Sequence, residues 1–163
     1  MGVNPPLFFI KGDMMDFKDF SKKYIGVREL SKEHEEIIDY YNKNCKPLPR
    51  NYKVKYNDSW CATFISFILL HFKTINPPYE CSANRMYNKC ITNKQIIKKP
   101  KINDIVFYSW KRNGYVNHVG IISKINGNII TVIEGNKNNK VGTRNIKYNS
   151  PYILAFGRVK EVK

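Results

Sequence analysis

The stretch Trp60-Cys-Ala-Thr-Phe-Ile-Ser-Phe-Ile-Leu-Leu-His-Phe72 is apolar almost all round, and it decides the fold. A helix that is apolar on every side is normally buried inside a protein. Asp58 or Ser59 can cap the start of such a helix, and Pro77-Pro78 lies just beyond its end. We therefore expect a buried helix over residues 60–72.

Further helices are expected on both sides of this stretch. Residues 16–24 fit a short helix, and Ser31 can cap another that runs to about Cys45. The latter has acidic residues in its first turn, where the helix dipole favours them, and its apolar residues recur at helical spacing. One more short helix is expected over residues 82–90.

After Pro100 the spacing of apolar residues changes from helical to strand-like. Strands are predicted over residues 105–108, 119–125, 129–134 and 153–159, with a weaker candidate at 143–148. Helices followed by an antiparallel meander indicate an α+β fold. At 163 residues the chain is long enough for one well-buried core and short for two, so we expect a single domain overall.

Cys61 lies in the first turn of the buried helix. Unpaired N–H groups and a partial positive charge at a helix start favour a thiolate, and the same N–H groups can hold an oxyanion. Most cysteines in apolar helices are small core residues instead. The position of Cys61 alone leaves both interpretations open.

A thiol nucleophile needs a base, and the chain has three histidines. His34 lies in the acidic first turn of an amphipathic helix, so we expect it to be exposed. His71 lies ten residues and roughly 15 Å of helix rise from Cys61, too far to reach the thiol. We expect it to interact with the helix C-terminus. His118, at the start of a strand, remains as the candidate base, although a lone strand histidine is more often structural.

Asn126-Gly127 marks the turn after the His118 strand. A two-residue loop would place Glu134 on the opposite side of the sheet from His118. A three-residue loop, 125–127, closed by a left-handed glycine, would place the two residues directly opposite each other. We predict the three-residue loop, because a carboxylate that orients the imidazole is what a Cys-His pair requires.

Two further residues are expected near this histidine. Asn136 would share the face of Glu134 and could assist or replace it. Gly120 either lets the helix N-terminus approach the sheet or marks a bulge, and the sequence does not separate these alternatives.

The chain has 28 Lys and Arg residues against 13 Asp and Glu, a formal net charge of +15. Such an excess favours attachment to polyanions, whether nucleic acid, anionic membrane or anionic wall polymers. Much of it is lysine spread singly along the chain, which fits a solvated basic surface equally well. The charge does not choose among these partners.

Nothing in the sequence indicates a disulfide framework, a zinc site or a membrane segment. The four cysteines include no C-x-x-C pair. Leu7-Phe-Phe-Ile10 is too short for a signal peptide, and no stretch approaches the ~20 apolar residues that span a bilayer. We therefore expect a protein that is made in a cytoplasm without a signal peptide.

Several blocks in order resemble CHAP domains, the cysteine, histidine-dependent amidohydrolases and peptidases. Trp60-Cys-Ala-Thr-Phe64 resembles their nucleophile motif, and Asn117-His-Val-Gly-Ile-Ile122, preceded by Asp104-Ile-Val-Phe-Tyr108, resembles their histidine strand. Ile133-Glu-Gly-Asn136 resembles the segment with the third and fourth polar residues, and the ending Ile153-Leu-Ala-Phe-Gly-Arg158 is also typical. The related NlpC-type peptidases share the order of cysteine before histidine.

The resemblance implies a papain-like α+β fold, with the cysteine on a buried helix packed on an antiparallel sheet. It implies a peptidoglycan hydrolase that cleaves an amide bond, either an N-acetylmuramoyl-L-alanine amidase or an endopeptidase of the stem or cross-bridge. Cys61 would be the nucleophile, His118 the base and acid, Glu134 the residue that orients the imidazole, and Asn136 a helper. Trp60, Trp110 and Tyr115 are expected to line the substrate groove.

The resemblance also limits what is expected around this site. Asp13, Asp16 and Asp19 do not reproduce the calcium-loop spacing of some CHAP domains, so we expect no metal and no cofactor. No glutamine precedes Cys61, so the backbone N–H of Cys61 and a donor from residues 55–59 would have to bind the oxyanion.

The match covers about residues 57–158. We expect residues 51–163 to form the CHAP-like catalytic core and residues 1–50 a helical extension packed on it. The expected partner is bacterial cell-wall peptidoglycan, and anionic wall polymers could attract the basic surface. Neither specific nucleic-acid binding nor a membrane span is expected. A wall hydrolase without a signal peptide suggests a phage or prophage lysin that acts at the wall after release or as part of a virion.

Two other functions compete with this one. The first is a cysteine hydrolase of the same fold that acts on an amide outside the wall. The second is a non-catalytic basic module that binds wall or nucleic acid, since the eleven tyrosines and many lysines suit single strands. Purified cell wall would distinguish them, because only a wall hydrolase releases amines from it.

Overall fold

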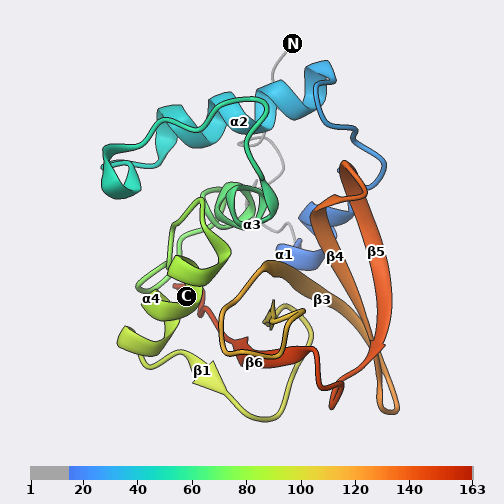
Figure 1. Cartoon of the computed structure of the whole chain (residues 1–163). Coiled ribbons are helices and arrows are strands. Elements are labelled where there is room, and N and C mark those ends of the chain that lie inside the picture. Colours follow the sequence, from blue (N-terminus) through green and yellow to red (C-terminus); the bar gives the residue numbers. More distant parts are fainter. Residues whose placement is uncertain (1–14, 163) are drawn as a thin grey trace.

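The computed structural model describes residues 15–162, so Asp13 and the apolar run at residues 7–10 lie outside the described residues. Within that range the chain forms four α-helices and six strands (Figure 1). The helices are α1 (Phe17–Lys22), α2 (Lys32–Asn44), α3 (Cys61–Leu69) and α4 (Ala83–Thr92). The strands are β1 (Ile96–Ile97), β2 (Ile105–Tyr108), β3 (His118–Asn126), β4 (Ile129–Lys137), β5 (Lys140–Lys147) and β6 (Ile153–Gly157).

The six strands form one antiparallel sheet in the order β1-β6-β2-β3-β4-β5. The α+β class is therefore confirmed. β1 was not predicted, since two residues are too few to show an alternating pattern. The weak candidate at 143–148 is a full strand that begins earlier, at Lys140.

The buried helix lies where the sequence predicts it, but it is shorter and differently capped. α3 runs from Cys61 to Leu69, and all nine of its residues are buried. The predicted cap by Asp58 or Ser59 is wrong: the N-cap residue is Trp60, and no side chain of the described residues caps the helix. Asp58 instead accepts hydrogen bonds from the Tyr52 hydroxyl at 2.6 Å and the Lys55 backbone N–H at 2.9 Å.

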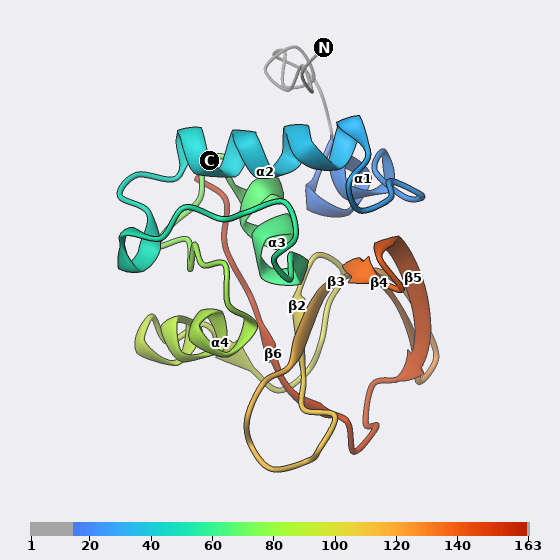
Figure 2. The ribbon, with the colours of Figure 1, turned by 45° about the horizontal axis from the view of Figure 1, so that its top comes forward.

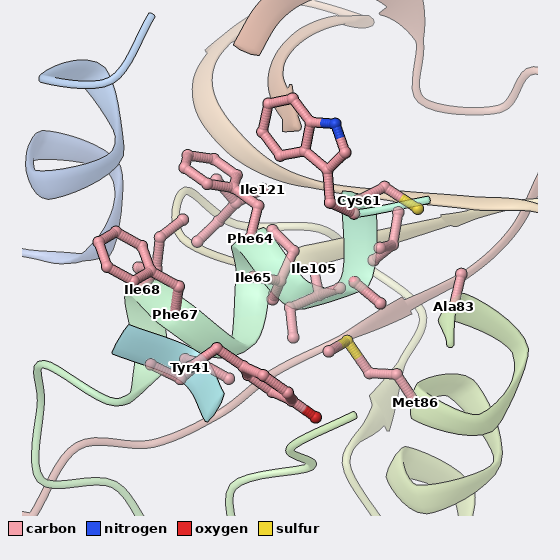
Figure 3. Close-up of a cluster of buried hydrophobic side chains, with 14 of the residues drawn as sticks. Tyr41, Cys61, Phe64, Ile65, Phe67, Ile68, Ala83, Met86, Ile105 and Ile121 are labelled. Atoms are coloured by element: carbon pink, nitrogen blue, oxygen red, sulfur yellow. The ribbon is translucent and has the colours of Figure 1, made fainter. Parts of the chain in front are cut away.

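α3 is the centre of the structure, lying between α2 and the sheet (Figures 1 and 2). Its apolar side chains meet Tyr41 of α2, Met86 of α4 and Ile121 of β3 in one buried cluster, with Cys61 at one end (Figure 3). A close approach to β4 is possible because Gly135 has no side chain. A Cβ at that position would lie only 2.6 Å from the Phe64 Cβ.

The β3–β4 turn differs from the prediction. Asn126 pairs with Ile129, so the loop has two residues, Gly127 and Asn128, and the three-residue loop 125–127 is wrong. The register then shifts by one residue at a bulge between Ile122 and Lys124. A bulge adds one residue to one strand, so it reverses which face the following side chains occupy.

The bulge returns His118 and Glu134 to one face of the sheet, but not to directly opposite positions. Beyond it Ile121 pairs with Ile133, which places Gly120, rather than His118, opposite Glu134. His118 lies two residues from Gly120, so its side chain is on the same face of the sheet as that of Glu134. The two residues are diagonal neighbours, and the predicted direct pair is wrong.

The N-terminal segment attaches to both sides of the core. α1 and α2 pack against α3, and α1 also contacts β3 and β4. Between these helices, Gly26 donates its backbone N–H to Val141 of β5 at 2.8 Å, and Val141 donates its own to Val27 at 2.8 Å. The division into an extension, 1–50, and a core, 51–163, stays a prediction. Across residues 15–162 no helix is both long and apolar enough to cross a bilayer.

Replacing Gly135 tests the contact between α3 and β4. Gly135→Ala should lower the free energy of unfolding in urea by about 1–3 kcal/mol, because the added methyl group overlaps Phe64. Gly142→Ala in β5 is the matched control, since its Cβ would meet only the flexible Lys137 side chain, at 3.3 Å, and should change stability by less than about 0.5 kcal/mol. Equal stability of the two variants would contradict the close packing.

Candidate active site

Cys61 is the first residue of α3 and is 4% exposed. The first hydrogen bond of the helix runs from the Phe64 N–H to the Trp60 carbonyl at 2.9 Å, so the N–H groups of residues 61–63 have no partner within the helix. Since no side chain of residues 15–162 caps the helix, these N–H groups remain available at its positive end. The thiol therefore lies beside backbone donors that can bind an oxyanion.

His118 is the first residue of β3, and its side chain bridges Cys61 and Glu134. Its Nε2 atom lies 3.0 Å from Oε1 of Glu134, and the Cys61 side chain is close enough to the ring to raise the pKa of the imidazole. Because Nε2 is engaged by the carboxylate, Nδ1 is the ring nitrogen left to face the sulfur. The three residues thus form a continuous chain from thiol to imidazole to carboxylate.

The surroundings of His118 favour its protonated form. Burial opposes the charge, since only 12% of the side chain is exposed, but hydrogen bonds and charge attraction from Cys61 and Glu134 outweigh it. The balance raises the pKa of His118 to about 9. The imidazole of His118 is therefore protonated at neutral pH.

Glu134 is fully buried, and its charge is compensated by Arg144 of β5. Nε of Arg144 donates to both carboxylate oxygens, at 3.1 and 2.9 Å, and its terminal nitrogen donates to Oε1 at 3.0 Å. Burial tends to raise the pKa of the carboxyl, but the hydrogen bonds from His118 and Arg144 lower it below the ordinary value. Glu134 therefore stays ionised and keeps a fixed direction toward the imidazole.

Aromatic rings enclose this ion pair. The Tyr108 ring lies 5.8 Å from that of His118, and the Arg144 guanidinium lies 4.9 Å from the centre of the Trp110 ring. The Tyr108 hydroxyl is close enough to Glu134 to lower the pKa of that carboxyl, although it forms no hydrogen bond of regular geometry within the described residues. Low exposure of these groups strengthens the attraction among the charges.

Gly120 leaves the space that the Glu134 side chain occupies. A Cβ on Gly120 would lie 2.8 Å from Cγ of Glu134 and 2.5 Å from Cγ1 of Val132. Neither alternative from the sequence is correct: the close approach of the helix occurs at Gly135, and the bulge occurs between Ile122 and Lys124. The glycine instead lets Glu134 cross its neighbouring strand toward His118.

A cavity of about 380 Å³ opens beside His118. It is lined by Trp110, His118, Asn136, Lys137, Asn138 and Arg144. Asn136 has a left-handed backbone, with φ of 56°, and its Nδ2 lies 3.4 Å from the Ser59 hydroxyl oxygen. Asn136 therefore reaches the segment just before the nucleophile, while its predicted role as helper or substitute for Glu134 stays a prediction.

The three aromatic residues that were expected to line the substrate groove lie in different surroundings. Trp110 lines the cavity, while its expected role in a substrate groove stays a prediction. Trp60 is fully buried and donates its indole N–H to Glu29 at 2.9 Å, so its expected place in the groove is wrong. Tyr115 is 54% exposed, but it is not among the described residues that line this cavity.

The other two histidines lie outside this site. His34 is fully buried, which corrects the expectation that it is exposed: its Nδ1 accepts the Leu30 N–H at 3.0 Å and its ring packs on Trp60. His71 contacts the Phe67 carbonyl through Nδ1 at 2.7 Å, near the end of α3 as expected. Burial lowers the pKa of His71 to about 4.

Sequence reasoning missed Arg144 and Tyr108 as parts of the site. The Asn138-Asn139 turn between β4 and β5, where both asparagines have positive φ, would by simple pairing place Arg144 opposite Ile133 and on the other face from Glu134. A register shift between Glu134 and Lys137 moves Arg144 opposite Val132, two residues from Glu134 and on the same face, and the sequence carries no signal for that shift. Within residues 15–162 no group of three or more His, Cys, Asp or Glu side chains is placed to hold a metal ion.

The comparison with known families gives one match, to the part of the chain that carries these residues. A model described as CHAP domain matches residues 51–136, a range that includes Cys61, His118 and Glu134 and ends before Arg144. No curated protein and no solved structure gives a match to the chain.

Arg144→Gln tests whether the buried carboxylate depends on its guanidinium partner. The variant should lower the free energy of unfolding at pH 7 by about 1–3 kcal/mol, because a buried charge loses its charged donors. Arg112→Gln is the matched control: Arg112 is exposed and contacts the Tyr152 ring, so its loss should have little effect. A urea titration that gives the same midpoint for both variants would refute the dependence.

Proposed function

The chain belongs to the CHAP domain family of amidases and peptidases, and from this premise we propose that it is a peptidoglycan hydrolase that cleaves an amide bond with Cys61 as nucleophile. The observation that carries the proposal is the continuous contact from the Cys61 thiol through His118 to Glu134. A cysteine, a base and a residue that orients the base are the three parts that thiol hydrolysis requires.

In the first step the Cys61 thiolate attacks the amide carbonyl carbon, and a C–S bond forms as the carbonyl oxygen takes the negative charge. The backbone N–H groups at the start of α3 would bind this oxyanion. The Ser59 hydroxyl is the candidate donor from the preceding loop, because its oxygen accepts from Asn136 and its hydrogen remains free to donate. The C–N bond then breaks as the His118 imidazolium gives its proton to the leaving amine.

In the second step water hydrolyses the thioester. The neutral His118 takes a proton from the water, which attacks the carbonyl carbon, and the C–S bond breaks to regenerate the thiolate and imidazolium. Glu134 keeps its charge throughout and stabilises the imidazolium in each half of the cycle. The catalytic cycle therefore needs no group beyond these side chains, the helix N–H donors and water.

We also propose that the fold is papain-like. A nucleophile at the start of a buried helix, followed in the chain by a histidine on an antiparallel sheet, supports this assignment. The cavity beside Trp110 and His118 is the candidate place for the substrate strand. Its asparagine side chains suit the peptide groups of a wall stem or cross-bridge.

The wild-type protein should release free amines, but no sugar reducing ends, from purified peptidoglycan. Cys61→Ala should abolish this release of amines. Cys81→Ala is the matched control, because Cys81 is a partly exposed free thiol outside the site, and it should keep wild-type activity. Thermal unfolding should show that both variants are folded. Wild-type lysis by Cys61→Ala would refute the nucleophile assignment, and inert wall with the wild type would point to an amide outside the wall.

The pH dependence of kcat/KM should reflect His118. Above a pKa of about 9 the imidazolium loses the proton that the leaving amine needs, so activity should fall on the alkaline side there. Glu134→Gln removes the carboxylate that favours the charged ring, so the same fall should occur at lower pH and with a reduced maximum. An alkaline limb that does not move in this variant would exclude His118 as the titrating group.

A further inference from the structure

A second polar hollow lies along α4, away from the residues of the candidate site. Two adjoining cavities, of about 490 and 310 Å³, share Asn76 and Asn93 as common walls. We name the combined depression the α4 groove and define it by Asn76, Arg85, Lys89, Asn93, Lys94 and Lys160. None of these residues takes part in the proposed catalysis.

A buried carboxylate holds two cations in the α4 groove. Glu80 is fully buried, and its Oε2 lies 3.3 Å from Nε of Arg85 and 3.4 Å from Nζ of Lys89. Lys89 also donates to the Tyr79 carbonyl at 2.7 Å. Glu80 is fixed in turn by Ser66 of α3, whose hydroxyl accepts from the Glu80 N–H and donates to its carbonyl. These cations are therefore held in place before any ligand arrives.

The spacing of residues along α4 places these cations on one side of the helix. Arg85, Lys89 and Thr92 recur at intervals of four and three residues and line the groove. Met86 and Cys90 lie on the opposite side and are fully buried in the core. α4 is thus an amphipathic helix whose polar face forms one wall of the groove.

The groove carries a net positive charge. Five cationic side chains and one carboxylate line the two cavities. Lys94 and Lys160 are exposed, and neither forms a salt bridge with any of the described residues. The remaining cation, Arg158, is held by Asp104 at 2.8 Å. The charge of Lys94 and Lys160 is therefore available to an anionic ligand.

The neutral residues of the groove indicate the chemistry of that ligand. Side-chain amides of Asn76, Asn88, Asn93 and Gln95 can donate to and accept from hydroxyl groups. Among the described residues that line the two cavities there is no aromatic side chain on which a nucleic-acid base could stack. A groove lined by cations and amides, and not by aromatic rings, suits a hydroxylated polyanion better than a single-stranded nucleic acid.

We propose that the α4 groove binds a phosphodiester-linked polyol chain of the bacterial wall, an inference that rests on the proposed function for its choice of polymer. The N-terminal end of α4 lies beside the catalytic strand, since the Asn84 side chain accepts the Val116 N–H at 3.0 Å, two residues before His118. The groove follows the same helix from Arg85 onward, and Asn93 lies roughly 13 Å of helix rise from Asn84. A polymer bound there holds the cleavage site close to the wall.

Binding of soluble poly(glycerol phosphate) to the full chain tests this proposal. The double variant Lys94→Gln/Lys160→Gln should raise the Kd at low salt about tenfold, because two phosphate contacts are lost. The matched control, Lys124→Gln/Lys147→Gln, removes the same charge from exposed positions on β3 and β5 and should change the Kd less than about twofold. Unchanged thermal midpoints should show that both double variants are folded.

Two results would overturn the proposal. An equal rise in Kd for both double variants would assign the binding to overall charge and not to the groove. Competition by a single-stranded oligonucleotide of the same charge, at equal affinity and with the same dependence on Lys94 and Lys160, would assign the groove to nucleic acid. The release of amines by the wild type is measured separately, on peptidoglycan that carries no such polymer. A failure of the proposed hydrolysis is thereby distinguished from a failure of the α4 groove to bind the polymer.

Discussion

The structure depends on the ionised carboxylate of Glu134, which lies fully buried in the sheet. A buried charge is costly unless it is paired and hydrogen-bonded. Here Arg144 contacts both carboxylate oxygens and His118 contacts Oε1, so three adjacent strands must be in register for the charge to be compensated. The same pairing that stabilises the sheet therefore orients the imidazole toward the sulfur.

Two glycines and one β-bulge allow these side chains to come together. The bulge after Ile122 brings the side chains of His118 and Glu134 to one face, Gly120 gives the carboxylate space to cross a strand, and Gly135 lets α3 approach β4. Each of these features adjusts the backbone by about one residue or one methyl group. Together they bring the cysteine at the start of α3 close enough to the histidine of β3 to affect the pKa of its ring.

The strongly periodic parts of the chain could be predicted from sequence, and the local deviations could not. The all-round apolar pattern of 60–72 located α3, and the alternation after Pro100 located β2 to β4 and β6. The turn after β3 was predicted with the wrong residues and the wrong length, because Asn-Gly suits several turn types and a bulge leaves no pattern of its own. Long-range contacts such as those of Arg144, His34 and Trp60 depend on packing between distant segments, which single-residue properties do not encode.

The hydrogen bonds of Gly26 and Val27 with Val141 of β5 have a practical consequence for work on shortened chains. β5 is the last strand of the sheet, and this N-terminal segment covers part of its otherwise unpaired edge. An uncovered strand edge is a template for self-association. Cutting the chain at residue 51, where the family match begins, would also remove α2 from the apolar surface of α3. The boundary of the family match is therefore not a boundary of the folding unit, and a fragment that begins there is expected to aggregate.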